Sequence, residues 1–224
     1  MTSKVGSLTR WRYLHLLIAL LVMLVAYPYA GGGGALGVAA VLIPIASVFA
    51  LAIERRYRAV PIVLGAVMVA GVVQEAAGVD RLPILVVGVS GLLLYASTTL
   101  FVLGRVLRSE RVTGDTLCGA IAVYLMIGLT WSLGYVLLEY LHPGSYQLAA
   151  AARQATGKDL LYFSYVTVAT LGYGDVVPVT DGARSLAVLE GLCGTIYMAI
   201  LVARLIGLHL AHTGSPRQAQ SPPD

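Results

Sequence analysis

The sequence predicts an all-α integral membrane protein with six transmembrane helices. Only 12% of its 224 residues are charged, 58% are hydrophobic, and the mean hydropathy is +0.83. An average soluble domain has about 25% charged residues. The apolar residues also gather into six long stretches. The charged side chains are too few to cover a surface exposed to water. The composition therefore excludes a water-soluble enzyme.

Each predicted span is judged against the roughly 20 apolar residues that a helix needs to cross about 30 Å of hydrocarbon. The six stretches are Tyr13–Ala30, Ala35–Ile53, Ala59 to about Val79, Leu82–Gly104, Leu117–Leu138 and Ser185–Leu210. The third is the weakest, because its strictly apolar part ends before Gln74 and Glu75. No cleaved signal peptide is expected, because the first apolar run is longer than a signal core and no small-residue cleavage site follows it.

The basic residues predict the orientation. With the N-terminus inside, the inner side has eleven of them: Lys4, Arg10, Arg12, Arg55, Arg56, Arg58, Arg105, Arg108, Arg111, Arg204 and Arg217. The outer side has four: Arg81, Arg153, Lys158 and Arg184. We therefore expect a multi-pass protein of the cell membrane with both termini in the cytoplasm. Dispersed basic residues predict membrane lipids as partners and no nucleic acid.

The one long connection, Glu139 to Arg184, lies between the fifth and sixth spans. Its apolar run Leu160–Ala169 is too short to cross a membrane. Thr156 and Asp159 form a capping box for a helix that starts near Gly157, and Pro178 breaks the helical pattern. This order predicts a short helix that enters the membrane and an irregular stretch that returns to the same side.

That irregular stretch reads Thr170-Leu171-Gly172-Tyr173-Gly174-Asp175. Bare backbone at membrane depth is tolerated only where protein buries it or where it lines a water-filled path. Two glycines separated by one residue permit left-handed backbone angles that aim successive carbonyls to one side. The preceding helix, which ends at Ala169, points its partial negative charge the same way. Both features favour a cation.

The segment Thr170–Asp175 resembles the selectivity filter of potassium channels, usually TVGYG followed by Asp. The similarity to this pore superfamily, and to its small prokaryotic members, extends over roughly Leu117–Leu210. It implies a re-entrant pore helix and filter loop between spans five and six. It also implies a homotetramer that conducts potassium passively, with permeant potassium ions, no other cofactor or metal, and no enzyme activity. Three regions follow: a four-span membrane domain (1–111), a pore domain (112–212) and a short disordered cytoplasmic tail (213–224).

The resemblance assigns roles by position. The ion-binding residues would be Thr170, Leu171, Gly172, Tyr173 and Gly174, and the filter support would be Asp175, Tyr162 and Val166. Leu171 replaces the commoner Val, and Val166 stands where some members have Glu. Tyr162 and Phe163 occupy two positions that familiar members fill with Trp. Tyr162 could reach Asp175, whereas Phe163 cannot donate a hydrogen bond to Tyr173.

The last span carries the remaining candidates. Gly194 matches the inner-helix hinge glycine, although close packing would also explain a glycine there. Thr195, Met198 and Val202 would then face the cavity. Glu190 is an intramembrane carboxylate and so a functional candidate. It could brace a pore-helix hydroxyl such as Thr167, act in pH-sensitive gating, or be a satisfied structural carboxylate between subunits.

Several alternatives to a potassium channel remain open. A weakly selective cation channel and a non-conducting scaffold with a vestigial pore both fit the sequence. A potassium transporter with filter-like loops would need four repeats, whereas this chain has one. A membrane enzyme fits least, because no catalytic pair is visible. Arg105, Arg108 and Arg111 recur every third residue like a voltage sensor, but they follow the apolar span and fit the positive-inside rule better.

Overall fold

The computed structural model describes residues 11–26, 59–76, 84–109, 113–149 and 153–213. Its helices are α2 (Arg12–Ala26), α4 (Ala59–Ala76), α5 (Ile84–Arg108), α6 (Gly114–Leu141), α7 (Gly157–Val168) and α8 (Asp181–Thr213). Within the described ranges, three segments are long and apolar enough to cross a membrane: Leu85–Arg108, Gly114–Leu141 and Asp181–Gly207. These helices fit the predicted helical membrane protein. The second predicted span, 35–53, and most of the predicted tail lie outside the described residues, so the count of six spans stays a prediction.

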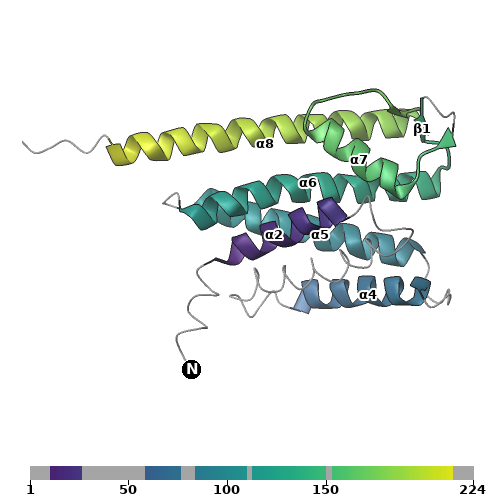
Figure 1. Ribbon diagram of the computed structural model, residues 1–224, viewed down its shortest axis with the longest axis horizontal. Helices are drawn as coiled ribbons and strands as arrows, with labels where there is room; N and C mark the ends of the chain where they lie inside the picture. Colours follow the sequence, from purple (N-terminus) through teal and green to yellow (C-terminus); the bar gives the residue numbers. More distant parts are fainter. Residues whose placement is uncertain (1–10, 27–58, 77–83, 110–112, 150–152, 214–224) are drawn as a thin grey trace, which may run out of the picture.

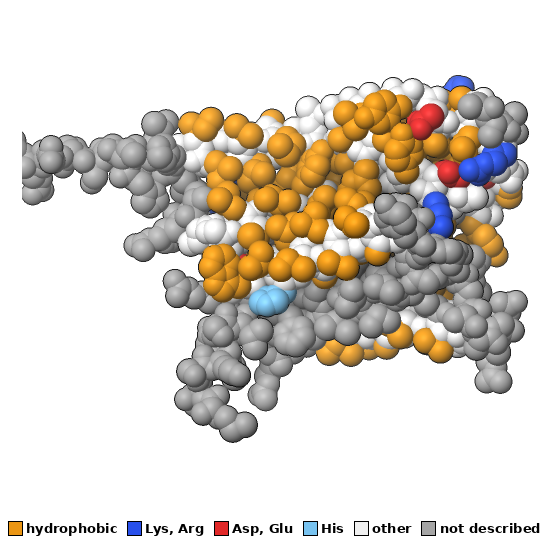
Figure 2. All heavy atoms as spheres, viewed as in Figure 1, with side chains coloured by type: hydrophobic (Ala, Val, Ile, Leu, Met, Phe, Trp, Pro, Cys, Tyr) orange, Lys and Arg blue, Asp and Glu red, His pale blue; other side chains and the backbone are white. Residues whose placement is uncertain are grey.

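The helices lie side by side (Figure 1). Helix α4 packs against α5, α5 against α6, and α2 against α6, while α7 contacts both α6 and α8. Helix α7 lies at one end of α8, and the C-terminal end of α8 extends from the other end of the bundle (Figure 1). In Figure 2, hydrophobic side chains cover the middle of the face shown, and Lys, Arg, Asp and Glu side chains gather near α7. This distribution is typical of a protein whose middle faces lipid.

Local side-chain hydrogen bonds fix where α6 and α8 begin and hold the turn that follows α6. Helix α6 starts after Thr113, whose hydroxyl accepts a hydrogen bond from the Thr116 amide at 3.2 Å. Helix α8 starts after Thr180, whose hydroxyl accepts from the Ala183 amide at 3.3 Å. At the far end of α6 the Glu139 carboxylate accepts from two amides of the following turn. The two threonines satisfy amides that helix N-termini leave without a partner, whereas Glu139 satisfies amides of the turn that follows α6.

A small sheet at this end departs from the predicted all-α class. Strand β1 (Tyr146–Leu148) is central and pairs antiparallel with β2 (Arg153–Gln154) and β3 (Val176–Pro178). Pro178 is tolerated because β3 is an edge strand. Strands this short have no periodic pattern, and the pairing of β1 with β3 joins segments about 30 residues apart, so only the tertiary fold defines them.

Candidate functional site

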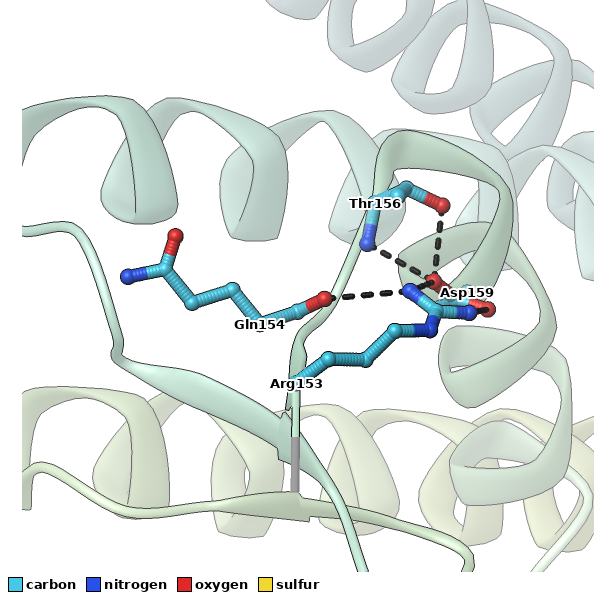
Figure 3. A network of polar contacts seen from close by, with 4 residues as sticks. All are labelled: Arg153, Gln154, Thr156 and Asp159. Atoms are coloured by element: carbon cyan, nitrogen blue, oxygen red, sulfur yellow. Dashed lines mark hydrogen bonds and ion pairs between the residues drawn. The ribbon is translucent and has the colours of Figure 1, made fainter. Parts of the chain in front are cut away.

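The N-terminus of α7 is fixed by the predicted capping box (Figure 3). The Asp159 carboxylate accepts hydrogen bonds from the Thr156 amide at 2.8 Å and the Thr156 hydroxyl at 2.7 Å. Arg153, from β2, forms an ion pair with Asp159 at 2.9 Å. Burial raises the pKa of Asp159, but hydrogen bonds from Arg153 and Thr156 outweigh that effect and leave this pKa below its ordinary value. The helix therefore starts at Gly157, as predicted.

The body of α7 is held against α6 by hydroxyl groups. The Tyr165 hydroxyl donates to the Leu125 carbonyl at 2.9 Å, and the Tyr124 hydroxyl of α6 donates to the Val168 carbonyl at 3.1 Å. Gly128 of α6 lets the two helices approach, because a Cβ there would lie 2.8 Å from the Tyr165 ring. These contacts position the last turn of α7, from which the candidate filter begins.

The end of α7 is a Schellman motif that leads directly into the candidate filter. The Thr170 amide donates to the Thr167 carbonyl and the Leu171 amide to the Val166 carbonyl, both at 2.9 Å. This pattern places Thr170 at C′, the position usually taken by glycine in the left-handed conformation. Thr170 has a φ of 57°, which is a costly angle for a β-branched residue. A strained residue held by its surroundings is a marker of function.

The left-handed conformation recurs at every second residue of the segment. Gly172 has a φ of 60° and Gly174 a φ of 76°. The expected left-handed glycines are therefore confirmed, and Thr170 adds a third position that the sequence did not indicate. Residues 169–175 are all exposed in the single chain, with Leu171 54% and Tyr173 65% exposed. Large apolar and aromatic side chains at such exposure need a partner surface or lipid to cover them.

The predicted filter support is only partly assembled within one chain. The Tyr162 hydroxyl interacts with the Asp175 carboxylate, as the sequence suggested. The Asp175 carbonyl accepts from the Ala149 amide at 2.9 Å, which ties the end of the segment to the residue after β1. Val166 is buried. The Val166 carbonyl accepts the hydrogen bond from the Leu171 amide at the start of the filter segment.

Phe163 does not face the filter. It is buried in an aromatic cluster with Tyr135 of α6 and Tyr146 of β1, with ring centroids 5.2 to 5.7 Å apart. Packing among aromatic rings in the core stabilises α7 against α6 and the sheet. The position of Phe163 therefore contributes to the support of α7 rather than to a cuff around Tyr173.

Glu190 is fully buried, with 0% exposure, and joins three helices of the same chain. The Tyr135 hydroxyl of α6 donates to its Oε2, and Ser164 Oγ of α7 lies 2.5 Å from its Oε1. The expected brace exists, but its partners are Ser164 and Tyr135, not Thr167. The carboxyl group also lies within one chain, which corrects the interpretation that placed it between subunits.

Ser164 makes a second contact, with its Oγ 2.6 Å from the Gly128 carbonyl oxygen. A serine hydroxyl has one hydrogen, and the carbonyl can only accept. When the Ser164 hydroxyl donates its hydrogen to the Gly128 carbonyl, the contact between Ser164 and Glu190 requires the Glu190 carboxyl group to be the donor. A carboxylic acid at Glu190 satisfies both contacts at once.

Gly194 packs directly against the end of α7. A Cβ at this position would lie 2.7 Å from the Val168 carbonyl oxygen and 2.8 Å from Val168 Cγ2. Close packing therefore accounts for this glycine, and the hinge stays a prediction. Thr195, Met198 and Val202 are exposed in the single chain. Their predicted cavity-lining role also remains a prediction.

Four hydroxyl-bearing contributors to the site were not predicted: Ser164, Tyr135, Tyr124 and Tyr165. Each has a hydroxyl group inside an apolar helix, and that was the available signal, since a buried hydroxyl needs a hydrogen-bond partner. The sequence does not specify which partner.

Part of the chain resembles known ion channels. Residues 116–208 match the family model described as "Ion channel". Protein LctB of Bacillus caldotenax is 32% identical over 122 residues, which cover 53% of this chain and 90% of LctB. The inward rectifier potassium channel Kirbac3.1 of Paramagnetospirillum magnetotacticum is 32% identical over 82 residues, 35% of this chain and 24% of that protein. Two pore potassium channel a of Oryza sativa subsp. japonica is 35% identical over 79 residues, 33% of this chain and 21% of that protein. No solved structure matches the chain significantly.

Proposed function

The chain belongs to the ion channel family and to the potassium-channel pore superfamily, and on this premise we propose that it is a potassium-selective channel of the cell membrane. Potassium would pass down its electrochemical gradient through a filter formed by Thr170 to Gly174. The observation that carries this proposal is the left-handed conformation at alternate residues, Thr170, Gly172 and Gly174.

That alternation supports a row of carbonyl ligands. When every second residue takes the left-handed conformation, successive carbonyls turn toward one side instead of alternating as in a strand. Such a row can replace the water shell of a dehydrated cation. The return of β3 to pair with β1, where the connection began, supports a re-entrant loop that enters and leaves the membrane on one side.

A single filter strand encloses no path, so the proposal includes four identical chains around a central axis. Burial within one chain supports this assembly: 17% of the most apolar part of α8 is buried, against 39% for the corresponding parts of α5 and α6. In the tetramer, α8 and the filter would meet their neighbours, and Thr195, Met198 and Val202 would face the cavity below the filter.

In the proposed channel, the pore helix α7 is supported from behind and the chain has a defined orientation in the membrane. Glu190 would brace the pore helix α7 from behind through Ser164 and Tyr135. The basic ends of α5 and α8 would face the cytoplasm, and the sheet would face outward, in agreement with the positive-inside rule.

The test is a reversal-potential measurement in planar bilayers with potassium on one side and sodium on the other. We expect a value near the potassium equilibrium potential. Gly172→Ala should abolish selectivity, because alanine at a φ of 60° costs about 1–2 kcal/mol in each chain. Gly182→Ala is the matched control, since Gly182 is exposed on α8 with open space around it.

Two results would reject the proposal in different ways. Current that reverses near zero would identify a weakly selective cation channel whose filter relaxes. A correctly assembled protein that passes no current under any ionic condition or activator would instead identify a scaffold with a vestigial pore.

A further inference from the structure

We infer that a cavity at the junction of α2, α5 and α6 binds the phosphate group of an anionic phospholipid. The cavity has a volume of about 650 Å³ and lies at the end of the bundle opposite the sheet. Volumes of this size are typical of small-molecule sites. Two of the lining helices, α2 and α5, precede the region that matches the ion channel family, so most of the site lies outside that region.

Positive charge gathers at one side of the cavity. Arg105 and Arg108, in the last turn of α5, both line it. The Arg105 guanidinium lies 5.1 Å from the centroid of the Phe101 ring, which also lines the cavity. This cation–π contact holds the guanidinium at the cavity wall. Arginine forks bind phosphate oxygens through paired hydrogen bonds.

The first turn of α6 adds to this potential. Thr116 lines the cavity, and a helix N-terminus carries a partial positive charge that favours phosphate. The nearby Asp115 carboxylate opposes an anion, but it accepts hydrogen bonds from the Tyr13 and Leu14 amides at 3.0 and 3.4 Å. Its negative charge is therefore directed at the start of α2.

The apolar wall of the cavity favours a lipid over a soluble anion. Leu100 lines the cavity and is 67% exposed, on the surface that would face the bilayer. An acyl chain could lie along Leu100 and the neighbouring α5 surface while the phosphate reached Arg105 and Arg108. A free phosphate ion would leave this apolar side unused.

The cavity wall is also attached to α8. Arg204 donates hydrogen bonds to the carbonyls of Val106 and Ser109, and both residues line the cavity. A lipid that orders the end of α5 would therefore stabilise the hydrogen bonds from Arg204. Through Arg204 it would also stabilise the C-terminal part of α8.

The test is native mass spectrometry of the purified full-length protein in neutral detergent, titrated with dioleoylphosphatidylglycerol, dioleoylphosphatidylcholine or inorganic phosphate. We expect tighter binding of phosphatidylglycerol than of phosphatidylcholine. Arg105→Gln with Arg108→Gln should weaken phosphatidylglycerol binding by roughly 25-fold, about five-fold for each charge, and leave phosphatidylcholine binding unchanged. Lys158→Gln with Arg184→Gln removes the same charge at the other end of the bundle and should have no effect.

Three outcomes would overturn the inference: unchanged phosphatidylglycerol binding by the double variant, an equal loss in the control pair, or displacement of the lipid by millimolar phosphate. The last would assign the cavity to soluble anions. If the double variant does not fold, Arg108→Gln alone tests the same point, because this side chain is exposed. The lipid-binding assay does not depend on ion flux. A negative binding result is therefore distinguishable from a failure of the proposed potassium conduction.

Discussion

Replacement of Gly194 by alanine separates the two explanations of this glycine. The change adds one methyl group to α8, 2.7 Å from the Val168 carbonyl oxygen and 2.8 Å from Val168 Cγ2. Real Cβ atoms essentially never lie within 3.0 Å of such neighbours. Helix α8 must therefore move away from the end of α7, two residues before the filter.

The magnitude follows from a comparison with Gly191→Ala on the same helix. Both changes gain about 1 kcal/mol of helix propensity. Only Gly194→Ala also has the steric penalty, about 1–3 kcal/mol for an overpacked site, because no atom lies within 4 Å of a Cβ at Gly191. We expect Gly194→Ala to be about 2 kcal/mol per chain less stable than Gly191→Ala. That difference corresponds to a Tm lower by roughly 4–8 °C for a chain of this size.

The assay is thermal unfolding of the purified protein, with single-channel recording of the same variants. Val168→Ala in the Gly194→Ala background should restore only part of the loss, because the carbonyl contact remains. Equal stability of the two glycine variants, with a lower open probability in Gly194→Ala, would refute the packing argument and favour a hinge. Full recovery by Val168→Ala would refute the role assigned to the backbone contact.

Three further predictions concern the filter and its support. Thr170→Gly should stabilise the chain by about 1 kcal/mol, because glycine relieves the left-handed conformation, but it should weaken potassium selectivity in reversal-potential measurements. Glu190→Ala should lower the free energy of unfolding by about 1–3 kcal/mol, since it leaves the buried Tyr135 hydroxyl without its acceptor and removes one of the two contacts of Ser164, which still donates to the Gly128 carbonyl, whereas Glu190→Gln should cost less. The pKa of Asp159 is lowered by folding, so its stabilising contribution is present above its unfolded pKa, near 3.8, and is lost as the pH falls through the lower folded pKa. The stability difference between the wild type and Asp159→Asn should therefore shrink below about pH 4, as measured by thermal unfolding across pH.

Thr170→Ser keeps the hydroxyl and should retain selectivity; a Thr170→Gly variant that is less stable than wild type would contradict the strain argument. A Glu190→Gln channel with unchanged pH response and open probability would leave Glu190 a structural brace only. A wild-type stability advantage over Asp159→Asn that does not decrease as the pH falls below about 4 would contradict the hydrogen-bonded carboxylate.

Several elements could be predicted from local sequence because local interactions determine them. The helical stretches follow from the length of apolar runs, and the start of α7 follows from Thr156 and Asp159, which are three residues apart. The left-handed angles of Gly172 and Gly174 follow from the absence of a side chain. In each case the residues that fix the structure are close neighbours in the chain.

The left-handed conformation of Thr170 was decided by the tertiary structure. The residue at this position is a threonine, and a β-branched side chain disfavours a positive φ angle. The Schellman motif enforces it, because α7 is docked on α6 and must end where the filter begins. A rule based on glycine could not have found this residue.

The partners of buried side chains were also decided only by packing. Phe163 lies with Tyr135 and Tyr146, Glu190 contacts Ser164 rather than Thr167, and β1 pairs with β3 across about 30 residues. The sequence by itself determined that these groups need burial or a hydrogen bond. Only the crossing of α6, α7 and α8 determined which groups meet, because contacts between distant segments depend on helix rotation and separation, and neither is encoded in a local pattern.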